Sequence, residues 1–131
     1  MIYFDASAMV TYLSGRPNFA ALYDYLDSRR DLRAATSTLG PIETVRTCDR
    51  IGNYPNLLAH LLRQYSELEI TSEIRDEAAS LPGPLTTLNA IHVVTAETLG
   101  DHLAALITYD RQLALVARAR GLPVASPGAN F

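Results

Sequence analysis

The sequence predicts an α/β protein: a three-layer α/β/α domain with a central parallel sheet of four to five strands, formed as one domain by residues 1–131. Two observations predict this class. Short apolar segments alternate along the chain with segments of helical periodicity, as parallel sheets covered by helices require. The chain has 131 residues and is 48% hydrophobic, which suits one sizeable core.

The expected strands are short and mostly apolar. The first ends at Asp5, and Pro123 makes the last one suitable only for a sheet edge. The segments expected to form strands are Ile2 to Phe4, Leu32 to Ser37, Leu68 to Ile70, Ala104 to Thr108 and Pro123 to Ala125.

The expected helices show apolar residues at helical spacing and end at breaking residues. Gly15-Arg16-Pro17 separates the first two, and Gly121 is expected to terminate the last one. The segments expected to form helices are Ala6 to Leu13, Asn18 to Ser28, Leu39 or Pro41 to Ile51, Leu57 to Tyr65, Ser72 to Ser80, Thr87 to Leu99, and Arg111 to Arg120.

Composition and charge exclude several classes of function. The net charge is −3, which argues against a protein that coats nucleic acid nonspecifically. The chain has no Lys, so mechanisms that need a catalytic lysine are excluded, among them receiver domains and haloacid-dehalogenase-like phosphatases. Cys48 has no possible internal disulfide partner, no apolar run could span a membrane, and the N-terminus does not resemble a signal peptide. A cytoplasmic protein is expected.

Three acidic residues follow the expected strands closely. Asp5 ends the first strand, Asp110 lies just after the fourth, and Glu43 falls in the first turns of the helix after the second. Ligands of parallel sheets bind beyond the carboxyl ends of the strands, so these acids should converge if the first and fourth strands are neighbours. Clustered carboxylates favour Mg²⁺ or Mn²⁺, which can activate water and polarise a phosphodiester.

The same acids also permit an ordinary structural interpretation. Asp5 and Asp110 could be N-caps of the helices that follow them, and Glu43 could be a solvated helix residue. The spacing of the residues leaves both interpretations open.

Four segments, in this order along the chain, resemble the motifs of the PIN-domain family, and within it the VapC-type toxins. The second pairs Glu43 with Arg46, and the third matches a Leu-Asp-Ala-Ile-His pattern except at position 89. The segments are Asp5-Ala6-Ser7-Ala8, Glu43-Thr44-Val45-Arg46, Leu88-Asn89-Ala90-Ile91-His92 and Thr108-Tyr109-Asp110-Arg111.

The resemblance implies a divalent-metal-dependent endoribonuclease, often a homodimer, that cleaves structured RNA such as tRNA or rRNA and is blocked by a VapB-type antitoxin. It implies that position 89 completes an acidic quartet, with Asp5, position 89 and Asp110 at the metal. Ser7 and Thr108 would support the site, and Arg46 would orient Glu43 or contact phosphate. The quartet positions are Asp5, Glu43, Asn89 and Asp110.

Asn89 departs from the family pattern, which has Asp there. Asn has nearly the same shape but brings no charge and two hydrogen-bond donors. We therefore expect weaker cation binding and slow or absent cleavage. Two origins are open: a natural, degenerate PIN domain, or a deliberate Asp-to-Asn replacement that silences a toxic enzyme, which the intact surrounding motif favours. The competing function is a catalytically dead PIN domain that binds RNA or protein.

Three other features carry weaker expectations. His92 is expected in the core or behind the site rather than as a metal ligand, because no His or Cys lies near it at zinc-ligand spacing. The amphipathic segment Leu57 to Tyr65 is expected to pack on the core. Part of it, or the region of Tyr12, Tyr23 and Tyr25, could instead line a groove for an antitoxin or a second subunit.

Overall fold

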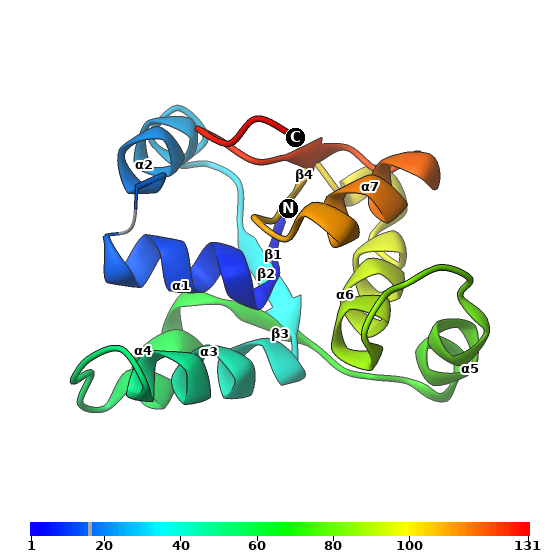
Figure 1. The fold of residues 1–131 in the computed structure, drawn as a ribbon, viewed down its shortest axis with the longest axis horizontal. Helices are drawn as coiled ribbons and strands as arrows, with labels where there is room; N and C mark the ends of the chain where they lie inside the picture. Colours follow the sequence, from blue (N-terminus) through cyan, green and yellow to red (C-terminus); the bar gives the residue numbers. More distant parts are fainter. Residues whose placement is uncertain (16) are drawn as a thin grey trace.

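The computed structural model describes residues 1–15 and 17–131, which form a five-stranded parallel sheet with helices on both faces (Figure 1). This confirms the predicted fold class. Arg16, in the predicted break after the first helix, lies outside the described residues. The elements are β1 (Ile2–Phe4), α1 (Ala6–Ser14), α2 (Phe19–Asp27), β2 (Ala34–Ser37), α3 (Leu39–Asp49), α4 (Leu57–Gln64), β3 (Ser66–Leu68), α5 (Ser72–Ser80), α6 (Thr87–Glu97), a 3₁₀ helix (Gly100–His102), β4 (Ala105–Ile107), α7 (Arg111–Ala119) and β5 (Val124–Ala125).

The strand order places the first strand in the middle of the sheet. The order is β3-β2-β1-β4-β5, and every neighbouring pair is parallel. The chain runs outward from β1 to β3 and then returns to the other side of β1, so the topological switch point lies between β1 and β4. Phe4 pairs with Ile107, which brings the next residues, Asp5 and Thr108, together at the carboxyl edge.

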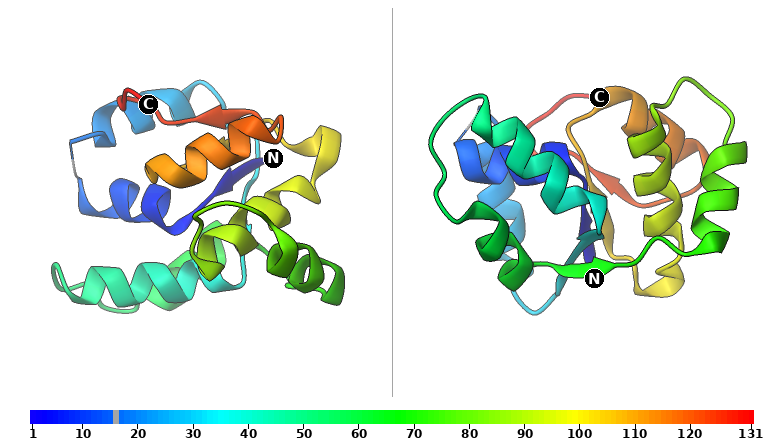
Figure 2. Two further views of the ribbon diagram at one scale, coloured as in Figure 1. Left: turned by 45° about the vertical axis from the view of Figure 1, so that its right-hand side comes forward. Right: turned by 90° about the horizontal axis from the view of Figure 1, so that it is seen from below.

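The two faces of the sheet have separate apolar cores, because neighbouring side chains of β1 point to opposite faces. Ile2 and Phe4 pack in one core with side chains of α1 to α4, including Met9. Tyr3 packs in the other with side chains of α6 and α7, including Val93. Figure 2 shows these two groups of helices on either side of the strands.

A few element boundaries differ from those predicted. β3 covers Ser66–Leu68, two residues earlier than expected, because its pairing with β2 sets Ser66 opposite Ala35. α6 ends at Glu97, and the turn after it is a 3₁₀ helix. Gly121 follows α7 with a φ of 84°, a left-handed conformation suited to glycine, as the sequence predicted.

In the described part of the chain, none of the helices has the length and apolar character needed to cross a membrane.

Candidate functional site

Asp5 lies at the centre of the carboxyl edge and is almost completely buried, with 2% of its surface exposed. It directly follows β1, and its Oδ1 accepts a hydrogen bond from the backbone N–H of Ala8, at 2.9 Å, as the N-cap of α1. Oδ1 also accepts from the hydroxyl of Ser7 at 2.6 Å, and Oδ2 accepts from the hydroxyl of Thr108. Both carboxylate oxygens are therefore held in place by donors from two neighbouring strand exits.

Ser7 and Thr108 connect Asp5 to the segment that carries Asp110. The Ser7 hydroxyl accepts from the backbone N–H of Tyr109 at 2.8 Å, and the Thr108 hydroxyl accepts from that of Asp110 at 3.0 Å. Each hydroxyl thus donates to Asp5 while it receives a backbone N–H from the loop after β4. This arrangement confirms that the two segments meet at the switch point.

Asp110 is also an N-cap, because its Oδ1 accepts from the backbone N–H of Leu113 at 3.0 Å at the start of α7. Its other oxygen, Oδ2, accepts from the side-chain amide nitrogen of Asn89, on α6, at 2.9 Å. The capping interpretation of Asp5 and Asp110 is therefore confirmed, and each side chain also contacts polar side chains at this edge.

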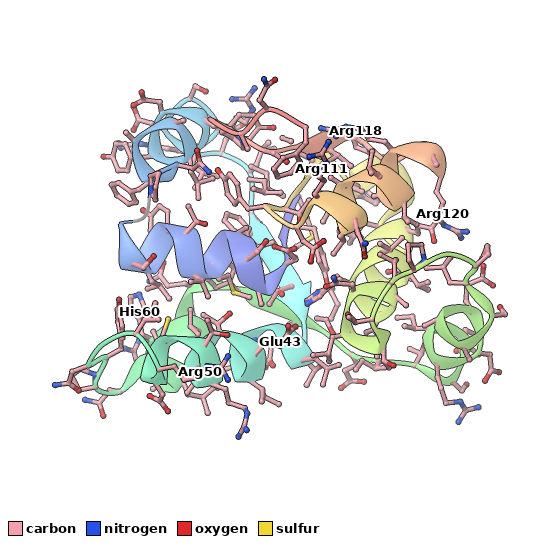
Figure 3. All side chains as sticks on the ribbon, in the orientation of Figure 1. Glu43, Arg50, His60, Arg111, Arg118 and Arg120 are labelled. Atoms are coloured by element: carbon pink, nitrogen blue, oxygen red, sulfur yellow. The ribbon has the colours of Figure 1, made fainter. Side chains whose placement is uncertain are left out.

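Glu43 lies near the start of α3, where Figure 3 shows it on the side of the helix toward the middle of the molecule. Its Oε1 lies 2.9 Å from Nε2 of His92, on α6. The Nδ1 atom of His92 lies 2.7 Å from the Tyr3 hydroxyl, which accepts from the backbone N–H of Ser37 at 3.1 Å. A series of contacts from β2 through β1 and α6 therefore ends at a carboxylate of α3.

The structure agrees with the buried position expected for His92 and gives Glu43 a partner other than Arg46. His92 is 1% exposed, as expected for a residue behind the site. The side-chain contact described for the Glu43 carboxylate is with His92, and Arg46 is exposed on α3, so its predicted contact with phosphate stays a prediction. No local pattern indicates that Tyr3, His92 and Glu43 are in contact, because the two pairs are 89 and 49 residues apart in the sequence.

A cleft of about 350 Å³ opens beside these side chains. Its walls include Ser7, Glu43 and Tyr109, so a molecule in it would contact Glu43 and the serine whose hydroxyl donates to Asp5. A second pocket, of about 340 Å³, lies elsewhere, and its walls include Tyr12, Leu61 and Tyr65. The predicted packing of Leu61 on the core is confirmed.

Burial governs the protonation of the ionisable groups at this edge. It raises the pKa of Asp5 above its usual range, and the hydrogen bonds from Ser7, Thr108 and the Ala8 backbone counteract this only in part. Burial also raises the pKa of Tyr3, and raises that of Tyr109 to about 12, so both phenols stay neutral and can donate. A buried carboxylate is costly unless positive charge lies near it.

The residues present fit a divalent cation only in part. Asp5 and Asp110 offer hard carboxylate oxygens, and Asn89 could add an amide oxygen. However, Asn89 presents its nitrogen to Asp110. Over residues 1–15 and 17–131, no three His, Cys, Asp or Glu side chains are grouped so as to hold a metal ion. The oxygen donors thus suit a divalent cation chemically, but the three acids expected to converge are not grouped to hold one, and the fourth position of the family pattern is Asn89.

Comparisons with known proteins agree with this architecture. The family model described as PIN domain matches residues 2–119. The ribonucleases VapC35 and VapC47 of Mycobacterium tuberculosis are 40% and 35% identical to the chain, and each alignment covers 98% of this chain and 98% of the relative.

Solved structures of toxins share the fold. A toxin–antitoxin complex from Klebsiella pneumoniae superposes with a TM-score of 0.73 at 20% identity, covering 99% of this chain and 100% of the other. VapC20 of M. tuberculosis, described as a sarcin–ricin loop cleaving toxin, superposes with a TM-score of 0.71 at 14% identity, covering 93% and 96%. The sheet, the ordered motifs and the two ribonuclease relatives together show that this chain belongs to the PIN-domain family, among the VapC-type toxins.

Proposed function

We propose that this protein is the toxin of a type II toxin–antitoxin system and has the site of a divalent-metal-dependent endoribonuclease that cleaves structured RNA such as tRNA or rRNA. One observation carries the proposal. Asn89 contacts Asp110 at the position the family motif gives to an acid, and the Thr108 hydroxyl links the segment of Asp110 to Asp5 at the switch point.

Asp5, Asp110 and the side chain at position 89 would hold Mg²⁺ or Mn²⁺. Such an ion lowers the pKa of bound water and offsets negative charge on a phosphodiester. Ser7 and Thr108 fix the orientation of Asp5. Glu43 lines the cleft where RNA would lie, and it would accept a proton from an attacking water.

Asn89 weakens this site for two reasons. It removes a negative charge from the cation's surroundings, and its amide nitrogen donates to Asp110, so the amide must turn over before its oxygen can bind a cation. We therefore propose that the present chain is weakened or inactive as a nuclease, whether Asn89 is natural or was introduced.

The partners that fit this function are a VapB-type antitoxin, an RNA substrate and a second copy of the chain in a homodimer. Several structural neighbours are toxin–antitoxin assemblies, such as the VapBC2 complex of Rickettsia felis, and these support the antitoxin as a partner. A toxin of this kind acts on RNA in the cytoplasm.

A second function is favoured by the Asn89–Asp110 hydrogen bond itself. This bond satisfies one oxygen of Asp110 without any cation, so the chain can fold stably with an empty site. A catalytically dead PIN domain that binds RNA or a partner protein would need no more than this.

The substitution Asn89→Asp tests the proposal. Without metal, the added carboxylate faces Asp110 and should lower the melting temperature. Mn²⁺ should raise the melting temperature of this variant more than that of the parent chain, and Mn²⁺-dependent RNA cleavage and toxicity on expression should appear or rise strongly. Fragment ends mapped with Mn²⁺ present or chelated would identify the bond that is cut.

Asn53→Asp is the matched control, because it adds the same charge in an exposed loop between α3 and α4. It should change neither metal response nor cleavage. If Asn89→Asp binds no cation and cleaves no RNA, the metal-nuclease assignment fails. If the chain binds RNA equally well with and without the cation, and with Asn89 or Asp at position 89, the result would support the binding module.

A further inference from the structure

We propose that His92 is a positioning residue: its neutral ring, held as the Nε2–H tautomer by the buried Tyr3 hydroxyl, fixes the Glu43 carboxylate at the cleft. This inference rests on the proposed function for its catalytic consequence. The tautomer and the contact are properties of the chain itself and can be tested without activity.

The contacts form one continuous chain from the interior to the cleft. The backbone N–H of Ser37, at the end of β2, donates to the Tyr3 hydroxyl at 3.1 Å. That hydroxyl lies 2.7 Å from Nδ1 of His92, and Nε2 of the same ring lies 2.9 Å from Oε1 of Glu43. Tyr3 is fully buried, whereas the Glu43 side chain is 27% exposed and lines the cleft.

The hydrogen-bond partners of the two ring nitrogens of His92 determine which nitrogen carries the proton. Since Tyr3 already accepts from the Ser37 N–H, its one proton can be given to Nδ1 of His92. A neutral imidazole that accepts at Nδ1 has its proton on Nε2, where it donates to Glu43. The opposite tautomer would set the lone pair of Nε2 against a carboxylate oxygen at 2.9 Å, which is repulsive.

The chain of contacts matters because Glu43 is otherwise weakly restrained. A long side chain such as Glu loses rotamer entropy when it is fixed, so it stays mobile unless a contact holds it. The described side-chain contact that restrains its carboxylate is the one with His92, whose ring is in turn held by Tyr3 through a hydrogen bond and an edge-on ring contact. Partners of this kind, one step behind an active group, are worth about 10- to 100-fold in activity.

Nitrogen-15 NMR of histidine-labelled protein tests the tautomer directly. The chain has three histidines, so His60→Gln and His102→Gln assign the spectrum. We expect His92 to give the pattern of a neutral Nε2–H ring at neutral pH, and Tyr3→Phe to shift the Nδ1 resonance, because that nitrogen loses its hydrogen-bond donor. An Nδ1–H ring or an imidazolium at His92 in the parent chain would overturn the proposal.

The catalytic consequence is measured with Asn89→Asp present in every variant. His92→Leu should lower kcat about 10- to 100-fold with KM nearly unchanged. His92→Gln can accept from Tyr3 and donate to Glu43 through one amide, so it should recover much of the rate. The control His60→Gln changes an exposed residue on α4 and should have no effect.

The outcomes separate the two proposals. If no variant cleaves RNA but the NMR shows the expected tautomer, the nuclease function fails and the positioning contact stands. If Asn89→Asp cleaves RNA and His92→Leu, shown to be folded by circular dichroism, cleaves equally well, the positioning role is refuted. Equal losses for His92→Leu and His92→Gln would also refute it, because the donor and acceptor would then not matter.

Discussion

Two acids at the same edge of the sheet, Asp5 and Glu43, are held in opposite ways. Asp5 is 2% exposed and receives donors from Ser7, Ala8 and Thr108. Glu43 is partly exposed, and the donor described for its carboxylate is one ring nitrogen of His92. Asp5 belongs to the hydrogen bonds that join the ends of β1 and β4, whereas Glu43 is held by the buried His92 ring and lines the cleft.

The two acids therefore differ in how much each contributes to the stability of the fold. Asp5 is tied to its position by a helix cap and two hydroxyls, so removing it damages the structure as well as the chemistry. Glu43 contributes little to the fold, so removing it should affect the chemistry alone. Stability and activity should therefore separate between the two residues.

The largest effect on stability is expected for Asp5→Ala. It removes the cap of α1 and leaves the hydroxyls of Ser7 and Thr108 without their acceptor, which together should cost about 3 kcal/mol of unfolding free energy. Urea unfolding measures the change. Asp31→Ala, at an exposed position, is the control and should not alter stability measurably. A small loss for Asp5→Ala would show that the hydroxyls find other partners.

An intermediate effect is expected for Asp110→Ala, which should cost about 1 kcal/mol because it removes the cap of α7. Asp110→Ser keeps a capping oxygen and should restore most of this stability. Neither variant should respond to Mn²⁺ when Asn89→Asp is also present, since Asp110 is a proposed ligand. Thermal unfolding with and without Mn²⁺ tests both points, and a retained metal response would remove Asp110 from the ligand set.

The smallest effect on stability is expected for Glu43→Gln, which should cost about 0.5 kcal/mol or less because a partly exposed contact is replaced by a neutral one. With Asn89→Asp present, the same change should reduce RNA cleavage severely. Urea unfolding measures the change in stability and single-turnover cleavage measures the change in activity, both on the same preparation. A stability loss as large as that of Asp5→Ala would contradict the contrast between the two acids.

Much of this architecture follows from local sequence. The alternation of apolar and amphipathic segments predicted the layers, and the Asp residues after β1 and β4 predicted two caps, because a cap bonds to a backbone N–H only three residues away. The boundaries of β3 were predicted less well, since its ladder depends on the position of β2 rather than on its own residues.

The sequence by itself determined the fold class, the capping acids and the missing charge at position 89. Only the tertiary structure decided that the amide of Asn89 donates to Asp110, 21 residues away, and that His92, rather than Arg46, contacts Glu43. The physical reason is that these contacts join α6 to α7 and α6 to α3. Their geometry depends on how the helices pack on the two faces of the sheet, and no local pattern in the chain encodes it.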